Sequence, residues 1–491
     1  MSVSSLLNVA RGALLAHQRA VGVIGHNIAN AETPGFSRQV VHLAAADPQA
    51  FPPIGQIGNG VGLVGIDRAR SAFFDQNWRR EAGVQSQYQA LHQTLEQVSG
   101  ILGEPSDTGI QASLDHLIDS FHTLASNPID PTGRAIVVAN AVALVDKLHI
   151  VDSRIDGVAQ NIGAELASAV RDINATVNEL ADLNVQIVRA GGQAPDLLDR
   201  RDLALDKLGQ YLDVRIVERP QGSIDVLQGG LQLVSSGGST QLLSLAGTGP
   251  YQLQIGNPPV TVTASGGKLK GLMDAFAAIG TKTTPGARGT GFRGQLDDLV
   301  TGLVTAVNQI HSDYDPTTKP LQPTLTPAPS PLKVGIVPFF DPNGVTAASI
   351  KLNPAIAADS SLISAGWSTA AGDNTIAARL ADLRNLAIPV PGFTGGTTTS
   401  PAVAAGSSTV AGDFYTSLVA GFGITVQDAS NRVASQTTLV DNIGAQRQDV
   451  SGVSIDEEMV KLIEYQQAYT AAARLVKVAD DMLKELINLG R

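Results

Sequence analysis

The stretch LNVARGALLAHQRAVGVIGHNI, residues 7–28, repeats apolar side chains at alternating steps of three and four residues. The residues at these steps are Leu7, Ala10, Leu14, His17, Val21, Ile24 and Ile28. This spacing predicts a long helix with one seam that packs against a second helix, as in a coiled coil. Small residues on its other faces, such as Gly12, Ala16 and Ala20, permit close approach of a neighbouring helix.

The helix is expected to stop at Thr33-Pro34-Gly35-Phe36. Pro34 disfavours helical backbone at Thr33, the residue before it. Pro34 and Gly35 fit the two central positions of a type II turn. The chain therefore reverses direction shortly after the first helix.

A second long helix is predicted between residues 131 and 190. Asp130 is a good N-cap, and Pro131 suits the first helical position. From Ile155 to Ile187 the apolar residues recur about every 3.5 positions, and Gly191-Gly192 ends the pattern. A helix of this length is longer than a compact domain is wide, so a rod-like element is expected.

The C-terminal arm mirrors the N-terminal one. Ser454-Ile-Asp-Glu457 is a capping box at a helix start. The apolar stripe that follows consists of Leu462, Tyr469, Ala473, Val476, Leu483 and Ile487. The two terminal helices could be ordinary core helices of a globular domain. Alternatively, they pair with each other and with copies of themselves, because two helices alone cannot bury all these faces.

Glycine and proline are concentrated between residues 211 and 420, which hold 26 of 50 Gly and 17 of 25 Pro. Both weaken helix interiors, and residues 214–217, 223–227 and 260–263 alternate at period two, so strands are predicted there. Only residues 295–311 return to helical spacing. Residues 322–331 and 395–409 have the composition of loops.

The expected fold class is therefore multidomain α+β: a coiled-coil-like bundle of both termini, a helical shell domain and a β-rich central insertion. We predict an inner domain from residues 1–39 and 454–491, and a helical domain from 40–210 and 421–453 that contains the helix 131–190. Residues 211–420 form the β-rich part, as one domain or as two subdomains.

Composition excludes several classes of function. The 491 residues include no Cys, which excludes disulfides, thiol catalysis and Cys-ligated metals. A net charge of −11 argues against binding to nucleic acid or to an anionic membrane surface. Both partners require clusters of Lys and Arg, which this chain does not offer. No apolar run approaches the length that spans a bilayer. The first residues lack the pattern of a cleaved signal peptide.

Motifs that suggest chemistry are weak. Gly60-Val-Gly62-Leu-Val-Gly65 matches a dinucleotide fingerprint, but no βαβ unit surrounds it, so a Gly-rich extended segment is expected. Ser265-Gly-Gly-Lys268 matches the SxxK pattern of acyl enzymes, and a turn is more probable there. The eight His are scattered without metal-ligand spacing. We therefore expect no enzyme, with no catalytic, cofactor-binding or metal-binding residue.

Residues 27–39, NIANAETPGFSRQ, resemble the N-terminal signature of the axial proteins of the bacterial flagellum: rod, hook and hook-associated proteins. Its turn residues here are Asn30, Thr33, Pro34, Gly35 and Phe36. Many relatives have Tyr at the position of Phe36, so one local hydrogen bond is in doubt. Three further blocks, 120–134, 196–226 and 453–474, are similar to the hook-associated protein 1 family, that of the first hook-filament junction protein.

The resemblance implies a structural adaptor between hook and filament, located outside the cell in the flagellum and exported by the flagellar type III apparatus. Implied partners are further copies in a ring-like axial segment, the hook protein, the second hook-filament junction protein and an export chaperone. The expected assembly interface consists of Leu7, Leu14, Val21, Ile24, Ile28, Leu462, Tyr469, Val476 and Leu483. Rival hypotheses are another axial protein, such as the hook or distal rod protein, or an axial scaffold whose central domain carries an adhesin or an enzyme.

Overall fold

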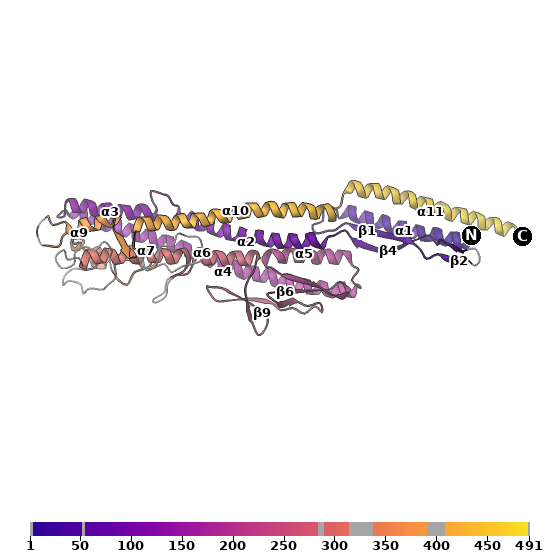
Figure 1. Cartoon of the computed structure of the whole chain (residues 1–491), viewed down its shortest axis with the longest axis horizontal. Helices are drawn as coiled ribbons and strands as arrows, with labels where there is room; N and C mark the ends of the chain where they lie inside the picture. Colours follow the sequence, from indigo (N-terminus) through magenta and orange to yellow (C-terminus); the bar gives the residue numbers. More distant parts are fainter. Residues whose placement is uncertain are drawn as a thin grey trace.

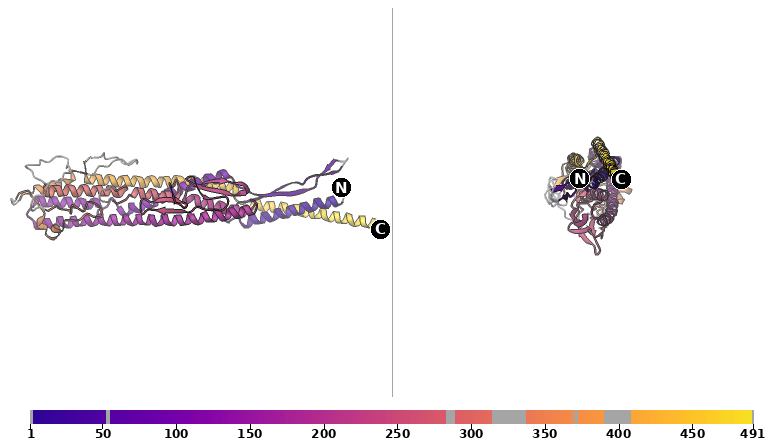
Figure 2. Two further views of the ribbon diagram at one scale, coloured as in Figure 1. Left: turned by 90° about the horizontal axis from the view of Figure 1, so that it is seen from below. Right: turned by 90° about the vertical axis from the view of Figure 1, so that its right-hand side faces the viewer.

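The protein is a long rod with both chain ends at one tip (Figures 1 and 2). The computed structural model describes residues 3–51, 55–282, 289–313, 337–368, 370, 372–389 and 408–489. Along its length the rod has two parts, a narrow one built on the terminal helices and a wider helical bundle (Figure 1).

The narrow part is an antiparallel pair of helices, α1 (Val3–Ala29) and α11 (Ile455–Leu489). The ring of His17 lies 5.9 Å from that of Tyr465, and Asn27, ten residues further on, reaches back to Glu458. A two-stranded ribbon of β1 (Gln39–Ala45) and β4 (Val61–Arg68) runs alongside α1, as Figure 1 shows. The pairing of the two ends, expected from their stripes, is confirmed within one chain.

The wide part is a bundle of long helices around one continuous apolar core. Its members are α2 (Ala72–Leu102), α3 (Ile110–Ser126), α4 (Pro131–Arg189), α5 (Pro195–Tyr211), α6 (Gly267–Ile279), α7 (Gly291–Asn308) and α10 (Ala411–Ser451). Helix α6 packs so closely on α2 that a Cβ atom at Gly271 would overlap the carbonyl oxygen of Gln87.

Helix α4 confirms the prediction made for residues 131–190. The side chain of Asp130 caps it by accepting from the N–H of Thr132 at 2.9 Å, and Pro131 is its first residue. Every member of the predicted seam is buried: Ile155, Ala159, Ile162, Leu166, Ala169, Ile173, Thr176, Leu180, Leu183 and Ile187. Gly191 and Gly192 end the helix at positive φ, 69° and 79°.

Strands occur in the central segment where period-two alternation predicts them. They form two small antiparallel sheets, ordered β5-β6-β7 and β10-β9-β8. Their bounds are β5 (Arg215–Glu218), β6 (Ile224–Gln228), β7 (Leu231–Val234), β8 (Leu243–Ala246), β9 (Gln252–Ile255) and β10 (Val260–Val262). Both sheets lie on the flank of the bundle (Figure 1).

Among the described residues between 264 and 313 the chain is largely helical, so the prediction of a β-rich part over the whole of 211–420 is wrong for this stretch. Helices α6 and α7 join the bundle, and α7 covers most of the helix predicted at 295–311 before a short π-helical turn, Gln309–Asp313. Shorter elements complete the fold: β2 (Gln49–Phe51), β3 (Gly55–Ile57), α8 (Pro354–Ala358), α9 (Thr375–Ala381), β11 (Ala387–Pro389) and β12 (Ser408–Val410). The predicted loops at 322–331 and 395–407 lie outside the described residues.

Two weak motifs have ordinary structural roles. Residues 61–65 of the GxGxxG string belong to strand β4, as expected for an extended Gly-rich segment. Ser265 and Gly266 precede helix α6, and Lys268 within that helix pairs with Glu165 at 3.3 Å. Neither segment has the geometry that its motif requires for chemistry.

Candidate functional site: the terminal helix pair and its polar joint

The buried apolar side chains of α1 and α11 are alanines, with the exception of Ile24. Ala10, Ala16 and Ala20 on α1 and Ala472 and Ala479 on α11 are all less than 5% exposed. Alanine lets two helices approach closely but removes little apolar area from water. The pair is therefore well fitted and weakly stabilised by its own contact.

The residues predicted for the assembly interface are only partly covered within one chain. Ile24 is buried at 4% exposure, and Tyr469 is 40% exposed. Half-buried are Leu7, Leu14, Val21, Ile28, Leu462, Val476 and Leu483. On α11 the face toward α1 includes Ala472 and Ala479, whereas Ala473 and Ile487 of the predicted stripe are exposed. Their role in assembly stays a prediction.

Helix α11 also exposes many large apolar side chains to solvent. They are Ile455, Met459, Val460, Ile463, Tyr469, Leu475, Val478, Met482 and Ile487, with exposed fractions between 40% and 66%. Isolated exposed apolar residues are common on protein surfaces, but a concentration along one helix marks an interaction surface. We refer to these nine residues as the exposed apolar residues of α11.

The signature turn has the predicted type II geometry. The N–H of Phe36 donates to the carbonyl of Thr33 at 3.1 Å, and Gly35 has φ 80°. Asn30 accepts from the Thr33 hydroxyl, and the ring of Phe36 packs edge-on against His26. A Cβ atom at Gly35 would lie 3.2 Å from Leu203 Cβ on α5, so the turn sits directly against the bundle.

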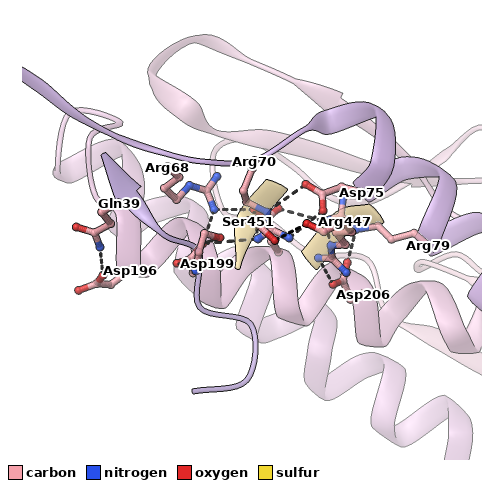
Figure 3. A network of polar contacts seen from close by, with 12 residues as sticks. Gln39, Arg68, Arg70, Asp75, Arg79, Asp196, Asp199, Asp206, Arg447 and Ser451 are labelled. Atoms are coloured by element: carbon pink, nitrogen blue, oxygen red, sulfur yellow. Dashed lines mark hydrogen bonds and ion pairs between the residues drawn. The ribbon is translucent and has the colours of Figure 1, made fainter. Parts of the chain in front are cut away.

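A cluster of polar residues joins the narrow part to the bundle (Figure 3). This polar joint consists of Asn27, Ser37, Gln39, Arg68, Arg70, Asp75, Arg79, Asp196, Asp199, Asp202, Asp206, Arg447, Ser451 and Glu458. They come from α1, β1, β4, α2, α5, α10 and α11 and the segments next to them. The backbone N–H of Arg38 adds a bond to the carbonyl of Ser451 at the end of α10.

Asn27 ties three elements of the narrow part together. Its side-chain amide donates to the carbonyl of Gln39 and to Glu458, both at 2.9 Å, and its oxygen accepts from the N–H of Gln39. Gln39 in turn donates to Asp196 at 2.8 Å. Ser37 gives Asp199 two bonds, from its N–H at 2.9 Å and its hydroxyl at 2.6 Å. Buried polar groups at this position are thus paired, and the pairs link α1, β1 and α11 to α5.

Four arginines and four aspartates alternate through the centre of the joint. Ion pairs within 3.1 Å join Arg68 to Asp199 and Asp202, Arg70 to Asp75 and Asp202, Arg79 to Asp202 and Asp206, and Arg447 to Asp75 and Asp206. The side chains are between 7% and 17% exposed. The Arg447 guanidinium also lies over the Trp78 ring, 5.0 Å from its centre. Arg70 also lies 3.6 Å from Asp199, so each of the four carboxylates has at least two cationic partners.

These contacts determine the charge state of the joint. Burial by itself would raise the pKa of the Asp202 carboxyl, but Arg70, Arg68 and Arg79 outweigh it and hold that pKa below its ordinary value. Burial likewise opposes the charge of Arg70, and Asp202 and Asp75 overcome it so that the pKa of Arg70 is raised. Asp202 and Arg70 are consequently each stabilised in the charged form by the opposite charges around them.

The sequence does contain a spacing pattern that indicates this joint, although none of the motifs considered in the sequence analysis includes it. Asp196, Asp199, Asp202 and Asp206 recur at steps of three, three and four, which places four carboxylates on one face of a helix. The four carboxylates would repel one another unless basic residues from other parts of the chain covered this face. Arg68 and Arg70, at alternate positions leaving a strand, supply part of that cover.

Among the residues that the structure describes, no group of His, Asp and Glu side chains is arranged to hold a metal ion. Within the same residues, no helix is long and apolar enough to cross a lipid bilayer.

Matches to two family models define the class of protein to which the chain belongs. The model of the flagella basal body rod protein family matches residues 7–36, and that of the flagellar basal body rod FlgEFG protein C-terminal region matches residues 444–489. These matches cover most of the helix pair and all of the signature turn. The chain is thus an axial protein of the bacterial flagellum.

The particular family follows from the remainder of the chain. The model of the flagellar hook-associated protein FlgK helical domain matches residues 95–315. Flagellar hook-associated protein 1 of Bacillus subtilis is 30% identical over 98% of this chain and 97% of its own length, and that of Salmonella typhimurium is 25% identical over 99% and 100%. The chain belongs to the flagellar hook-associated protein 1 family.

A solved structure of the flagellar hook junction protein FlgK from Burkholderia pseudomallei is also similar, with 24% identity and a TM-score of 0.42 over 48% of this chain and 44% of that one. Membership of the family makes the chain a structural component of the flagellum at the junction of hook and filament.

Proposed function

We propose that the chain adapts hook to filament through its terminal helix pair, which packs against neighbouring copies and other axial subunits in a ring-like segment. The observation that supports this most is the set of exposed apolar residues of α11. Burying a side chain of this size stabilises an assembly by about 1.5–3 kcal/mol. Coverage by neighbouring subunits would therefore supply the stabilisation that the alanine contact between α1 and α11 lacks.

Under this proposal the chain folds back on itself in three layers. Residues 1–39 and 454–491 form the inner domain, residues 40–210 and 421–453 form the shell together with α6 and α7, and the rest of residues 211–420 forms the outward part. The two small sheets on the flank of the bundle are consistent with an outward position (Figure 1). The contacts expected are with copies of the chain, the hook protein and the second hook-filament junction protein.

We propose further that the chain leaves the cell unfolded through the flagellar type III apparatus with the help of an export chaperone, and that it catalyses no reaction. Zero Cys suits such a route, since no premature disulfide can form during threading. The buried acids of the polar joint are neutralised by arginines, which leaves them unsuited to general acid or base chemistry.

A charge introduced on the exposed face of α11 tests the packing. In a flagellated strain whose own copy is replaced, Val478→Asp should abolish attachment of filaments to hooks, because a buried unpaired charge opposes packing. Immunodetection should find the variant exported to the medium and absent from hook tips. Thr470→Asp is the matched control, since Thr470 is already polar and exposed on the same helix. Normal swimming of the Val478→Asp strain would refute the proposal.

A further inference from the structure

Side chains of α7 hold an irregular stretch of backbone, residues 337–353, against the bundle. The hydroxyl of Thr301 donates to the carbonyl of Val345 at 2.7 Å. The amide of Asn308 donates to the carbonyl of Phe340 at 2.9 Å and accepts from its N–H at 2.7 Å. A further side chain, three residues after Asn308 in the π-helical turn, extends this attachment and is able to take up a proton.

This side chain is His311, whose ring is fully buried. Its Nδ1 lies 3.0 Å from the carbonyl oxygen of Val337, and its Nε2 lies 2.9 Å from the backbone nitrogen of Ser364. A carbonyl oxygen can only accept a hydrogen bond, and a backbone N–H can only donate one. Nδ1 therefore carries the proton and Nε2 the lone pair, so these two contacts require one neutral tautomer of the ring.

A second proton on the ring would break this arrangement. It would place an N–H on Nε2, directly opposite the N–H of Ser364, so that two donors would face each other. The charge would also lie among aromatic rings, since the centre of the Phe339 ring is 5.7 Å away and Phe339 packs on Phe121 and Phe340. Burial accordingly lowers the pKa of His311 from its ordinary 6.5 to about 4, although its bond to the backbone of Val337 acts in the opposite direction.

The described side chains packed around the ring supply no counter-charge for it. Residues 337–340 and 363–365 contain no charged residue. Helix α9 contacts the turn that carries His311, and its one charged residue, Arg379, is paired with Asp382 at 3.1 Å. The charged residue of α7 nearest in sequence, Asp298, is 13 positions away, or about 20 Å along a helix. A charged imidazole would thus be left without compensation.

We propose that His311 is an acid-sensitive latch. In its neutral form it fastens residues 337–340 and 363–365 to the end of α7, and in its protonated form it releases both. The latch lies beside α9, in the end of the rod remote from the two chain termini (Figure 1). Its release would loosen the aromatic cluster around Phe339 and leave the helix pair α1–α11 intact. The proposal is therefore independent of the role proposed for that pair in assembly.

The direction of the pH dependence follows from the lowered pKa of His311. Because the unfolded ring binds a proton more tightly than the folded one, the contribution of the neutral ring is complete above about pH 6.5 and is lost as the pH falls toward 4. Between pH 7 and 5 the equilibrium constant for opening this region should rise about twentyfold. Other titratable groups nearby, such as Asp297, which accepts from the N–H of Ala347, cancel when variants of His311 are compared.

Hydrogen exchange of the full-length chain, followed by mass spectrometry at pH 7 and pH 5 and corrected for intrinsic exchange rates, tests the latch. In the wild type, residues 337–340 and 363–365 should lose about twentyfold more protection between these two pH values than in His311→Gln. The glutamine amide offers one donor and one acceptor but does not titrate. His122→Gln, at an exposed position of α3, is the matched control and should behave as the wild type does.

Equal losses of protection in the wild type and in His311→Gln would overturn the proposal, as would a loss spread evenly over α4. If circular dichroism shows that His311→Gln is poorly folded, nitrogen-15 NMR of labelled histidines in the wild type decides the question. A buried ring that still carries its single proton on Nδ1 at pH 5 supports the latch. A ring with its proton on Nε2, or one that is half protonated near pH 6.5, contradicts it.

Discussion

The helix pair α1–α11 and the helical bundle are built from similar helices but are stabilised differently. In the bundle, α4 turns a seam made mostly of Ile and Leu into a closed core in which Ile155, Leu166 and Ile173 are fully buried. In the pair, the fully buried positions are alanines such as Ala10 and Ala479, and the large apolar residues of α11 remain exposed. Helical periodicity is common to both, so it does not by itself identify a self-sufficient core.

The contrast explains why a polar joint connects the two parts. An apolar connection would extend the bundle core into the pair and bury the surfaces that α11 keeps exposed. Ser37, Gln39 and Arg68 instead form directional contacts with aspartates of α5, which orient the narrow part without adding apolar burial. Each variant described below alters the bundle, the helix pair or the joint between them.

The largest effect is expected in the bundle core. Phe121 is fully buried, and its ring lies 5.5 Å from that of Phe339. Phe121→Ala should lower the free energy of unfolding by about 3–5 kcal/mol, because it removes apolar burial and leaves a cavity. Urea unfolding followed by circular dichroism measures this. Phe73→Ala is the control, since Phe73 is 68% exposed; an equal loss in both variants would contradict the assignment of the core.

A somewhat smaller effect is expected in the joint. Asp202→Asn removes the charge that pairs with Arg68, Arg70 and Arg79 and should cost about 3 kcal/mol. Because the pKa of Asp202 is lowered on folding, its contribution is present above its unfolded-state pKa, near 3.9, and is lost as pH falls through the folded value. The difference between wild type and Asp202→Asn should therefore stay constant from pH 8 to 5.

Asp196→Asn serves as the matched control for that measurement. It makes the same substitution on the same helix at a carboxylate that is 66% exposed. Exposed ion pairs contribute about 1 kcal/mol or less. If Asp202→Asn lowered the free energy of unfolding no more than Asp196→Asn does, the ion pairs of Asp202 would make no special contribution to stability.

The features that sequence predicted well are local ones. The Asp130 cap, the Pro131 start, the Gly191-Gly192 stop and the Thr33–Phe36 turn each depend on a few neighbouring residues, and the structure confirms them. The α4 seam was also predictable, because one helix supplies the whole pattern. Strands at 215–262 follow the same rule at period two.

The features that sequence did not predict depend on partners distant in the chain. By spacing alone, either Tyr469 or Ala472 could belong to a seam on α11. In the folded chain Ala472 is buried and Tyr469 is exposed. The polar joint pairs Arg447 with Asp75 and Asp206, residues more than 240 positions away. Local spacing shows that four aspartates share one face of α5 but not which arginines cover that face.

The smallest effects are expected at the N-caps of two helices, α4 in the bundle and α11 in the helix pair. The Asp130→Ala variant loses the cap of α4, and Ser454→Ala loses that of α11, where the Ser454 hydroxyl accepts from the N–H of Glu457 at 3.4 Å. Each cap contributes about 1 kcal/mol. We expect the bundle to unfold as one cooperative unit, because a continuous apolar core joins its helices, so Asp130→Ala should lower its overall stability. Ser454→Ala should only speed hydrogen exchange at the start of α11, because the pair opens independently of the bundle. Equal exchange changes in α4 and α11 for both variants would mean that the two parts unfold together, and that the polar joint couples them more tightly than the contrast in their packing implies.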